Sequence, residues 1–275
     1  MSAEKFFHSI SLLRCPVCGT AFSQSAASLV CANGHTFDPS KRGYVHFAPN
    51  AAPSHYSRTL FEARRRTLEA GFYDAVIDAI RTRMPTNPGV LLDAGCGDGT
   101  FTKRLMGETT VGIDLSKDAI QLAAHGGGPI LWAVGDLTRL PVKDASADVL
   151  LNLFSPAHYA EFHRVLKPDG MLIKLVPQQD YLREIRAWMG DRLRNEQYTN
   201  EAVVSHLFEQ FRISDRVRIT YTCALKHEQA EDFLLMTPLT FGAGTETLDA
   251  SALREITIDV ELLIADHKKD RNAGL

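Results

Sequence analysis

Four side chains near the amino terminus have the types and the spacing of a metal site. Cys15 and Cys18 are separated by two residues, and Cys31 and His35 follow further along the chain. A tetrahedral zinc ion takes thiolate and imidazole donors at about 2.0–2.3 Å, and two pairs on two tight turns can supply them. A redox motif and a buried packing cysteine are the alternatives, but no thioredoxin-like strand–helix context surrounds the first pair. We predict a structural zinc, because four protein donors leave no open coordination position.

A run of glycines after a buried strand could bring the backbone close to a small ligand. The sequence from Val90 to Thr100 reads Val-Leu-Leu-Asp-Ala-Gly-Cys-Gly-Asp-Gly-Thr, so that Gly95, Gly97 and Gly99 alternate with other residues. Glycine allows a ligand to approach the backbone where a Cβ would collide. The spacing is GxGxG and differs from the GxGxxG of dinucleotide folds, which favours S-adenosylmethionine as the ligand.

Three acidic residues stand at the ends of three successive predicted strands. Asp93 precedes the first glycine by two positions, where its carboxylate can bind the ammonium of the methionine part of the cofactor. Asp114 ends the next strand 21 residues later, where it can accept from both ribose hydroxyls. Asp136 follows the third strand, where it can accept from the adenine amino group. A helix cap or a solvated loop explains each acid alone, but three in succession favour the cofactor.

The segment Asn152-Leu-Phe-Ser-Pro156 ends the fourth predicted strand, where folds of this kind meet their substrate. Phe154 could stack on a flipped base and Asn152 could hydrogen-bond its edge. An asparagine cap and a core phenylalanine explain the same residues equally well. His158 is close to the same place, and no motif fixes which of the three residues takes part in catalysis.

Strands and helices of ordinary length alternate through the segment that must position these residues. This alternation predicts an α/β, doubly wound, Rossmann-like sheet with a small zinc-binding domain in front of it. The predicted strands are Val90–Asp93, Thr110–Asp114, Ile130–Val134, Ala147–Leu153 and Met171–Val176, with late strands at Ile213–Cys223 and Glu255–Ile264. The predicted helices are Gly99–Met106, Lys117–Ala124, Ala157–Leu166, Tyr181–Leu193 and Glu228–Met236, and Leu166–Gly170 is predicted as a turn.

The chain divides into three predicted parts. Residues 1–50 have a core that is too thin to stand without a metal. Residues 51–84 form a basic connector with a short linker and two helices, because the helical period from Leu60 to Met84 is interrupted at Gly71. Residues 85–275 form the cofactor-binding domain.

Composition and charge limit the kind of protein further. The 275 residues are 45% hydrophobic and 23% charged, which is typical of a globular protein, and no apolar run approaches the ~20 residues of a membrane span. No signal peptide is evident, so we expect a cytoplasmic protein with reduced cysteines. Residues 1–90 carry ten Lys and Arg against six Asp and Glu, although the net charge is −3. A phosphate-binding surface or the solvated face of a helix would explain this basic excess, whose candidate RNA contacts are Lys41, Arg42, Arg64, Arg65 and Arg66.

Taken together, the chain resembles bacterial 23S ribosomal RNA (guanine-N1)-methyltransferases over nearly its whole length. The resemblance rests on the zinc-ribbon segment from Cys15 to Asp38, Gly43-Tyr44-Val45, Ala63-Arg64-Arg65 with Leu68 to Tyr73, the Asp93–Gly99 turn and Leu235-Met236-Thr237-Pro238. It implies zinc on the four ligands, and cofactor contacts at Tyr73, Gly97, Asp98 and Tyr181, although some relatives have a histidine where Tyr181 aligns. It also implies a homodimer whose basic cleft holds an RNA hairpin.

Under this resemblance the reaction is methylation of N1 of a guanine, and a group must take up the N1 proton or stabilise the anion at O6. Two other functions compete with it. A small-molecule methyltransferase of the quinone-pathway type would share the glycine turn but needs neither a zinc ribbon nor an arginine-rich connector. A non-catalytic zinc-ribbon RNA-binding protein would be expected to lose the three acids. The sequence leaves open which guanine of the hairpin is modified.

Overall fold

The computed structural model describes residues 3–48, 56–190, 200–240 and 249–267 of the chain. One eight-stranded sheet organises the molecule, in the order β10-β11-β9-β8-β5-β6-β7-β4. The strands from β4 to β9 in this order run parallel, while β11 and β10 are antiparallel additions at one edge. Its strands are β4 (Tyr44–His46), β5 (Val90–Ala94), β6 (Thr109–Asp114), β7 (Leu131–Val134), β8 (Ala147–Leu153), β9 (Leu166–Pro177), β10 (Phe211–Ala224) and β11 (Glu255–His267).

Helices flank the sheet and follow its strands in sequence, as the doubly wound prediction requires. Ser57 and Ser116 cap two of them, because each hydroxyl accepts from a backbone N–H three residues on. The helices are α1 (Glu4–His8), α2 (Arg58–Glu69), α3 (Asp74–Arg81), α4 (Thr100–Arg104), α5 (Lys117–Ala124), α6 (Tyr159–Val165), α7 (Arg183–Met189), α8 (Glu201–Gln210) and α9 (His227–Met236). Short 3₁₀ turns lie at Ile10–Leu12, Leu137–Arg139, Pro238–Thr240 and Ala250–Ala252.

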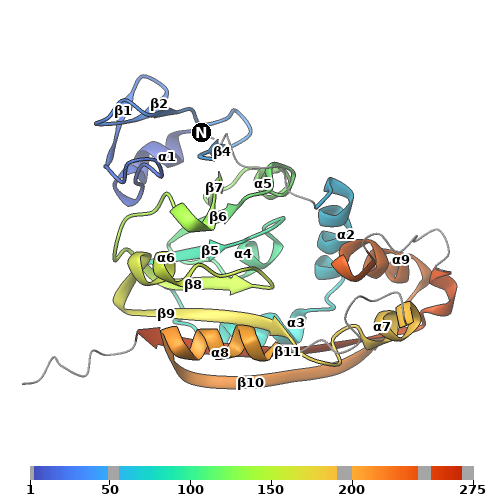
Figure 1. Ribbon diagram of the computed structural model, residues 1–275. Coiled ribbons are helices and arrows are strands. Elements are labelled where there is room, and N and C mark those ends of the chain that lie inside the picture. Colours follow the sequence, from blue (N-terminus) through green and yellow to red (C-terminus); the bar gives the residue numbers. More distant parts are fainter. Residues whose placement is uncertain (1–2, 49–55, 191–199, 241–248, 268–275) are drawn as a thin grey trace, which may run out of the picture.

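The zinc-binding part has a sheet of its own but shares the core of the large domain. Its strands β1 (Phe22–Ser25), β2 (Ser28–Cys31) and β3 (Thr36–Phe37) pair antiparallel. In Figure 1 this part lies beside β4 and β7, at the edge of the large sheet opposite β10 and β11. Side chains such as Leu13 and Phe22 belong to the same buried cluster as Leu131 and Val142 of the large domain.

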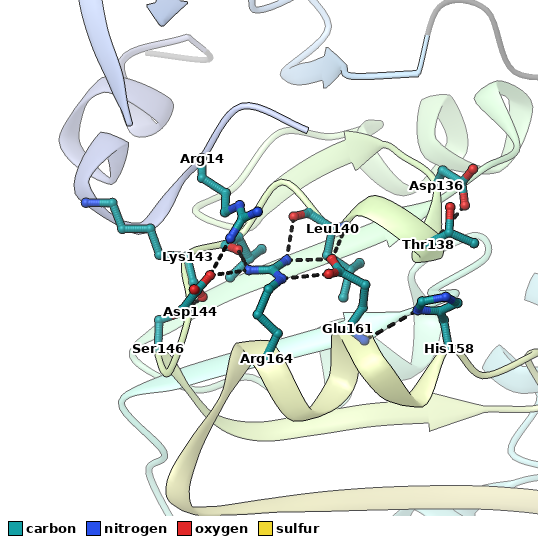
Figure 2. Close-up of polar contacts among 11 residues, drawn as sticks. Arg14, Asp136, Thr138, Leu140, Lys143, Asp144, Ser146, His158, Glu161 and Arg164 are labelled. Atoms are coloured by element: carbon teal, nitrogen blue, oxygen red, sulfur yellow. Dashed lines mark hydrogen bonds and ion pairs between the residues drawn. The ribbon is translucent and has the colours of Figure 1, made fainter. Parts of the chain in front are cut away.

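Polar contacts join the two parts as well. Figure 2 shows Arg14 and Arg164 on either side of Asp144, whose carboxylate accepts from both guanidinium groups, at 2.7 Å from Arg164. The backbone N–H of Arg14 donates to the carbonyl of Pro141, and the N–H of Lys143 donates to the carbonyl of Leu12. The amino-terminal part therefore has a fixed position against the sheet.

Several predicted boundaries differ from the structure. Residues 44–46, placed by the sequence in the amino-terminal domain, form β4 and extend the large sheet through parallel pairing with β7. The segment Leu166–Gly170, predicted as a turn, is the start of β9, but only Leu166 pairs with β8, opposite Ala147, and regular pairing resumes at Met171. The predicted helices Gly99–Met106, Ala157–Leu166 and Tyr181–Leu193 are shorter than expected, and residues 191–193 lie outside the described residues. Within the described residues, no helix is long and apolar enough to cross a membrane.

Candidate functional site

The four predicted zinc donors converge in the amino-terminal part. The thiols of Cys15, Cys18 and Cys31 and the imidazole of His35 all lie within 4.8 Å of one another. The Sγ atoms of Cys18 and Cys31 are 3.6 Å apart, and Nδ1 of His35 lies 3.6 Å from Cys15 Sγ and 3.3 Å from Cys31 Sγ. Bond lengths of about 2.0–2.3 Å give tetrahedral edges of about 3.3–3.8 Å, so the donors fit a zinc ion.

The local chemistry of Cys18 favours metal binding. Hydrogen bonds from the hydroxyl and the backbone N–H of Thr20 lower the pKa of the Cys18 thiol to about 5. The thiolate is the form that binds zinc. Gly19 and Gly34 have φ of 74° and 79°, so each cysteine turn closes through a left-handed glycine that returns its N–H to the cysteine carbonyl. This arrangement confirms the structural zinc that the sequence predicts.

Asp93, the last residue but one of β5, has a buried carboxylate that the protein only partly satisfies. Its Oδ2 accepts from the hydroxyl of Thr102 at 2.6 Å, while Oδ1 has no hydrogen-bond partner among the residues that the structure describes. Burial raises the pKa of this carboxyl to about 7. A buried oxygen without a partner is costly, and the ammonium of a methionine group would supply the missing donor. The site therefore fits the predicted cofactor at this point.

The three glycines of the turn have different surroundings. A Cβ on Gly95 would lie 1.9 Å from Ser155 Oγ, and one on Gly99 would lie 2.5 Å from the ring of Trp132. These two glycines make room for neighbouring side chains. Gly97 has φ of 55°, and a Cβ there would meet nothing closer than Phe61 at 3.7 Å within the described part of the chain. Gly97 is thus the position of the turn with room for a ligand above the backbone.

The other two predicted acids accept hydrogen bonds from backbone N–H groups. Asp114 accepts from Gly97 at 2.9 Å and from Ser116 at 2.8 Å, and burial raises the pKa of its carboxyl. Each oxygen keeps a second lone pair for a ribose hydroxyl. Asp136 accepts from the N–H of Thr138, as Figure 2 shows, and so caps the 3₁₀ turn. The capping explanation holds for Asp136, and its second carboxylate oxygen is available for adenine.

An aromatic cluster lies beside the turn. The hydroxyls of Tyr73 and Tyr181, two predicted cofactor contacts, are 2.6 Å apart. Phe154 stacks on Tyr181 with ring centroids 5.5 Å apart, and Phe101 lies 6.1 Å from Tyr73. Phe154 has φ of 53°, a strained conformation for a phenylalanine that marks functional sites in many proteins. The structure thus brings Tyr73, Phe154 and Tyr181 together.

The side-chain amide of Asn152 makes its hydrogen bonds within the protein. It is fully buried, and its amide nitrogen donates to the carbonyls of Ala94 and Pro156 at 3.0 and 2.9 Å. Its Oδ1 accepts from Nζ of Lys174 at 2.5 Å. Both protons and the oxygen are used, so Asn152 fixes the loop after β8 and offers no free donor to a base edge.

Lys174 was not predicted from the sequence. It is 1% exposed, and its Nζ also lies 3.3 Å from the carbonyl of Ser155. Burial lowers its pKa to about 8. The signal available in the sequence was a lysine at the centre of an otherwise apolar strand, Met171–Val176, which is unusual because lysine is rarely buried.

His158 caps α6. Figure 2 shows its ring turned toward the start of the helix, where Nδ1 accepts from the N–H of Glu161 at 3.4 Å. This contact uses Nδ1, so Nε2 is the ring nitrogen left for contacts outside the helix.

The three arginines of α2 have partners that differ from the expected phosphates. Arg65 donates to Asp98 at 3.2 Å and to the carbonyl of Leu122 at 2.8 Å. Arg66 forms a bidentate pair with Asp232 of α9. These contacts join α2 to the cofactor turn and to α9, a use of the two guanidinium groups that the sequence did not predict. Asp98 is itself engaged by Arg65 through its side chain.

Lys41 and Arg42 lie in the exposed turn before β4. These two predicted RNA contacts belong to the amino-terminal part, whereas Arg64, Arg65 and Arg66 belong to α2.

Two family models match the chain at the two sites just described. A model described as a methyltransferase domain matches residues 92–174, which include the turn and the loop after β8. A second model, described as the N-terminal part of RlmA and named for its zinc ribbon, matches residues 13–52.

Relatives of the same kind extend over almost the whole chain. A Bacillus subtilis protein assigned as a 23S rRNA (guanine-N1)-methyltransferase is 40% identical over 92% of this chain and 96% of its own length. The 23S rRNA (guanine(748)-N1)-methyltransferase of Streptomyces fradiae is 28% identical over 93% of this chain and 96% of its own. A Haloferax volcanii methyltransferase solved with its Trm112 activator has a TM-score of 0.50 at 18% identity, over 79% of this chain and 99% of that one. This last likeness concerns the fold alone.

Proposed function

Since this chain belongs to the 23S ribosomal RNA (guanine-N1)-methyltransferase family, we propose that it methylates N1 of a guanine in a hairpin loop of 23S rRNA. S-adenosylmethionine is the methyl donor, and a structural zinc ion holds the amino-terminal part. The observation that carries the proposal is the match over 92% of the chain, which includes both the zinc ribbon and the cofactor turn. A small-molecule methyltransferase would need no counterpart of the zinc ribbon.

The residues at the carboxyl ends of the strands would hold the cofactor and the acceptor base in position. When bound, the cofactor supplies an electrophilic methyl group, and displacement at this carbon requires the acceptor nitrogen in line with the leaving sulfur. We assign Asp93 to the ammonium of the cofactor, Asp114 to the ribose hydroxyls and Asp136 to the adenine. Orientation of the two reactants can contribute about 7–11 kcal/mol to such a reaction.

The aromatic cluster is the proposed place of the acceptor base. Phe154 and Tyr181 stack on each other, and Phe101 of α4, which follows the cofactor turn, belongs to the same cluster. Bases stack on aromatic side chains when they leave a loop, and stacking contributes about 1–3 kcal/mol per base. The loop that carries Phe154 is held by Asn152 and Lys174, which would keep the ring at a fixed distance from the methyl group.

We propose that Lys41 and Arg42 contact RNA phosphates. Both are exposed, and both belong to the basic amino-terminal part that the chain shares with its rRNA-methylating relatives. The resemblance also implies a homodimer in the cytoplasm; light scattering of the purified protein tests the dimer.

The function is tested by mass mapping of N1-methylguanine in 23S rRNA from cells with and without this gene. The proposal requires one guanine that carries the methyl group in the parent strain and lacks it in the deletion strain. Identical modification of 23S rRNA in both strains contradicts the proposal.

A further inference from the structure

Arg64, a predicted RNA contact, lies at the cofactor turn. Its Nη1 is 4.0 Å from the position that a Cβ on Gly97 would occupy, which is the open space above the turn. Its guanidinium carbon lies 5.7 Å from the centre of the Phe61 ring. Burial raises the pKa of Asp114, and the positive charge of Arg64 acts on that carboxyl in the opposite direction.

The neighbouring arginines differ from Arg64 in one respect. Arg65 and Arg66 each form an ion pair, with Asp98 and Asp232. Within the part of the chain that the structure describes, no carboxylate lies at ion-pair distance from Arg64, although the residue is half-buried. A half-buried guanidinium with no carboxylate at ion-pair distance fits a site whose anion arrives with a ligand.

The other end of Arg64 is held in place. Its Nη2 donates to the carbonyl of Met236 at 3.3 Å, and Met236 Sδ accepts from the hydroxyl of Thr67 at 3.1 Å. Figure 1 shows α2 and α9 side by side at this point. The carbonyl of Met236 thus fixes the guanidinium with Nη1 directed toward Gly97, which gives the Leu235–Pro238 segment a positioning role.

We propose that Arg64 binds the carboxylate of the methionine part of S-adenosylmethionine. That part carries an ammonium and a carboxylate on one carbon, and the site offers a charge for each. Among the described residues, Asp93 has a buried oxygen without a partner for the cation, and Arg64 has a guanidinium with no carboxylate at ion-pair distance for the anion. A planar guanidinium can take a carboxylate through two parallel hydrogen bonds, which a lysine cannot. The proposal rests on S-adenosylmethionine as the methyl donor.

The test compares two ligands in binding calorimetry without RNA. S-adenosylmethionine has the carboxylate, and its decarboxylated analogue lacks it. The wild-type protein should bind the analogue more weakly than the cofactor. Arg64→Met should bind the cofactor roughly ten- to a hundred-fold more weakly than the wild type does, because a charged hydrogen-bond donor is lost. The Arg64→Met variant should bind S-adenosylmethionine and its decarboxylated analogue with equal affinity.

Arg66→Met is the matched control, since it removes a neighbouring arginine of the same helix and should keep the wild-type preference. If Arg64→Met unfolds, Arg64→Lys gives the same comparison. Its preference for the cofactor should be intermediate, because the positive charge remains while the two parallel hydrogen bonds of the guanidinium are lost. An Arg64 variant that still prefers the cofactor as strongly as the wild type overturns the proposal. Wild-type protein that binds neither ligand would instead contradict the cofactor assignment itself.

Discussion

Asp93 combines a buried carboxylate, one satisfied oxygen and one oxygen without a partner among the described residues. Because the carboxylate is buried, its charged form is unfavourable, and the pKa of Asp93 is raised to about 7. A cation that enters the site restores the charged form, so binding of the cofactor ammonium is coupled to loss of a proton from Asp93.

Cofactor affinity should therefore rise with pH. Between about pH 6 and about pH 7.5 the ionised fraction of a group with a pKa near 7 grows roughly eight-fold, and the affinity should follow it. The range ends there because the α-amino group of the ligand itself loses its proton at about pH 8. Calorimetry across this range measures the effect. Asp93→Asn should bind weakly with no such rise, and a rise of the same size in that variant would remove Asp93 as its cause.

Lys174 and Asn152 should be coupled in stability. Lys174→Met leaves the buried Oδ1 of Asn152 without a donor, which should lower the free energy of unfolding by about 1–3 kcal/mol. When Asn152→Leu is added, the loss in the double variant should be smaller than the sum of the single losses, because the unsatisfied oxygen is removed too. Urea denaturation of the wild type, the two single variants and the double variant measures this coupling free energy. Additive losses would show that the two residues do not stabilise the loop together.

At the level of elements, the sequence predicts that the ribbon binds zinc, and the structure adds that loss of this zinc should also affect the large sheet. One zinc per chain should be found by elemental analysis, and Cys18→Ser should release it. Because β4 pairs with β7 and the two parts share a core, loss of zinc should speed hydrogen exchange in Leu131–Val134 as well as in the ribbon.

Cys223→Ser is the control for this experiment, since Cys223 lies on β10 far along the chain and should leave the zinc content unchanged. Stoichiometric zinc in a protein that lacks Cys15, Cys18 and Cys31 would contradict the site.

The elements that the sequence predicted correctly are those with a long local signal. The parallel strands from β5 to β9 are apolar runs of ordinary length, and each was placed to within a few residues except for the start of β9. A strand of three residues such as β4 has too little periodicity to be recognised, and its pairing with β7 depends on residues far away in sequence.

Side-chain partners were harder to predict than the residues that carry chemistry. The zinc donors and the three acids lie at positions that local spacing defines. The arginines of α2 look alike in sequence, but Arg65 meets Asp98 and Arg66 meets Asp232, which is 166 residues away. Their different partners follow only from the packing of α2 against the cofactor turn and against α9.

For the whole molecule, the distribution of charge predicts how RNA binds. Lys41→Ala and Arg42→Ala should weaken binding of a 23S rRNA hairpin. Each phosphate that is no longer neutralised should reduce the slope of log affinity against log salt by roughly 0.7–0.9, because fewer counterions are released. Arg66→Ala should leave the slope unchanged, because this guanidinium already pairs with Asp232. Filter binding across a salt series measures both effects, and wild-type slopes in the Lys41 and Arg42 variants would place the RNA surface elsewhere.

The whole molecule should transfer a methyl group to N1 of a guanine in 23S rRNA. The direct measurement incubates the purified zinc-loaded protein with S-adenosylmethionine and unmodified 23S rRNA, and then analyses the digested nucleosides by mass spectrometry. A methyl group at N1 also blocks the Watson–Crick edge, so reverse transcription of the product should stop next to one guanine of a hairpin loop. N1-methylguanine is expected at that stop, and none with Asp93→Asn. Methylation at another atom, or no methylation of 23S rRNA by a protein that binds the cofactor, would contradict it.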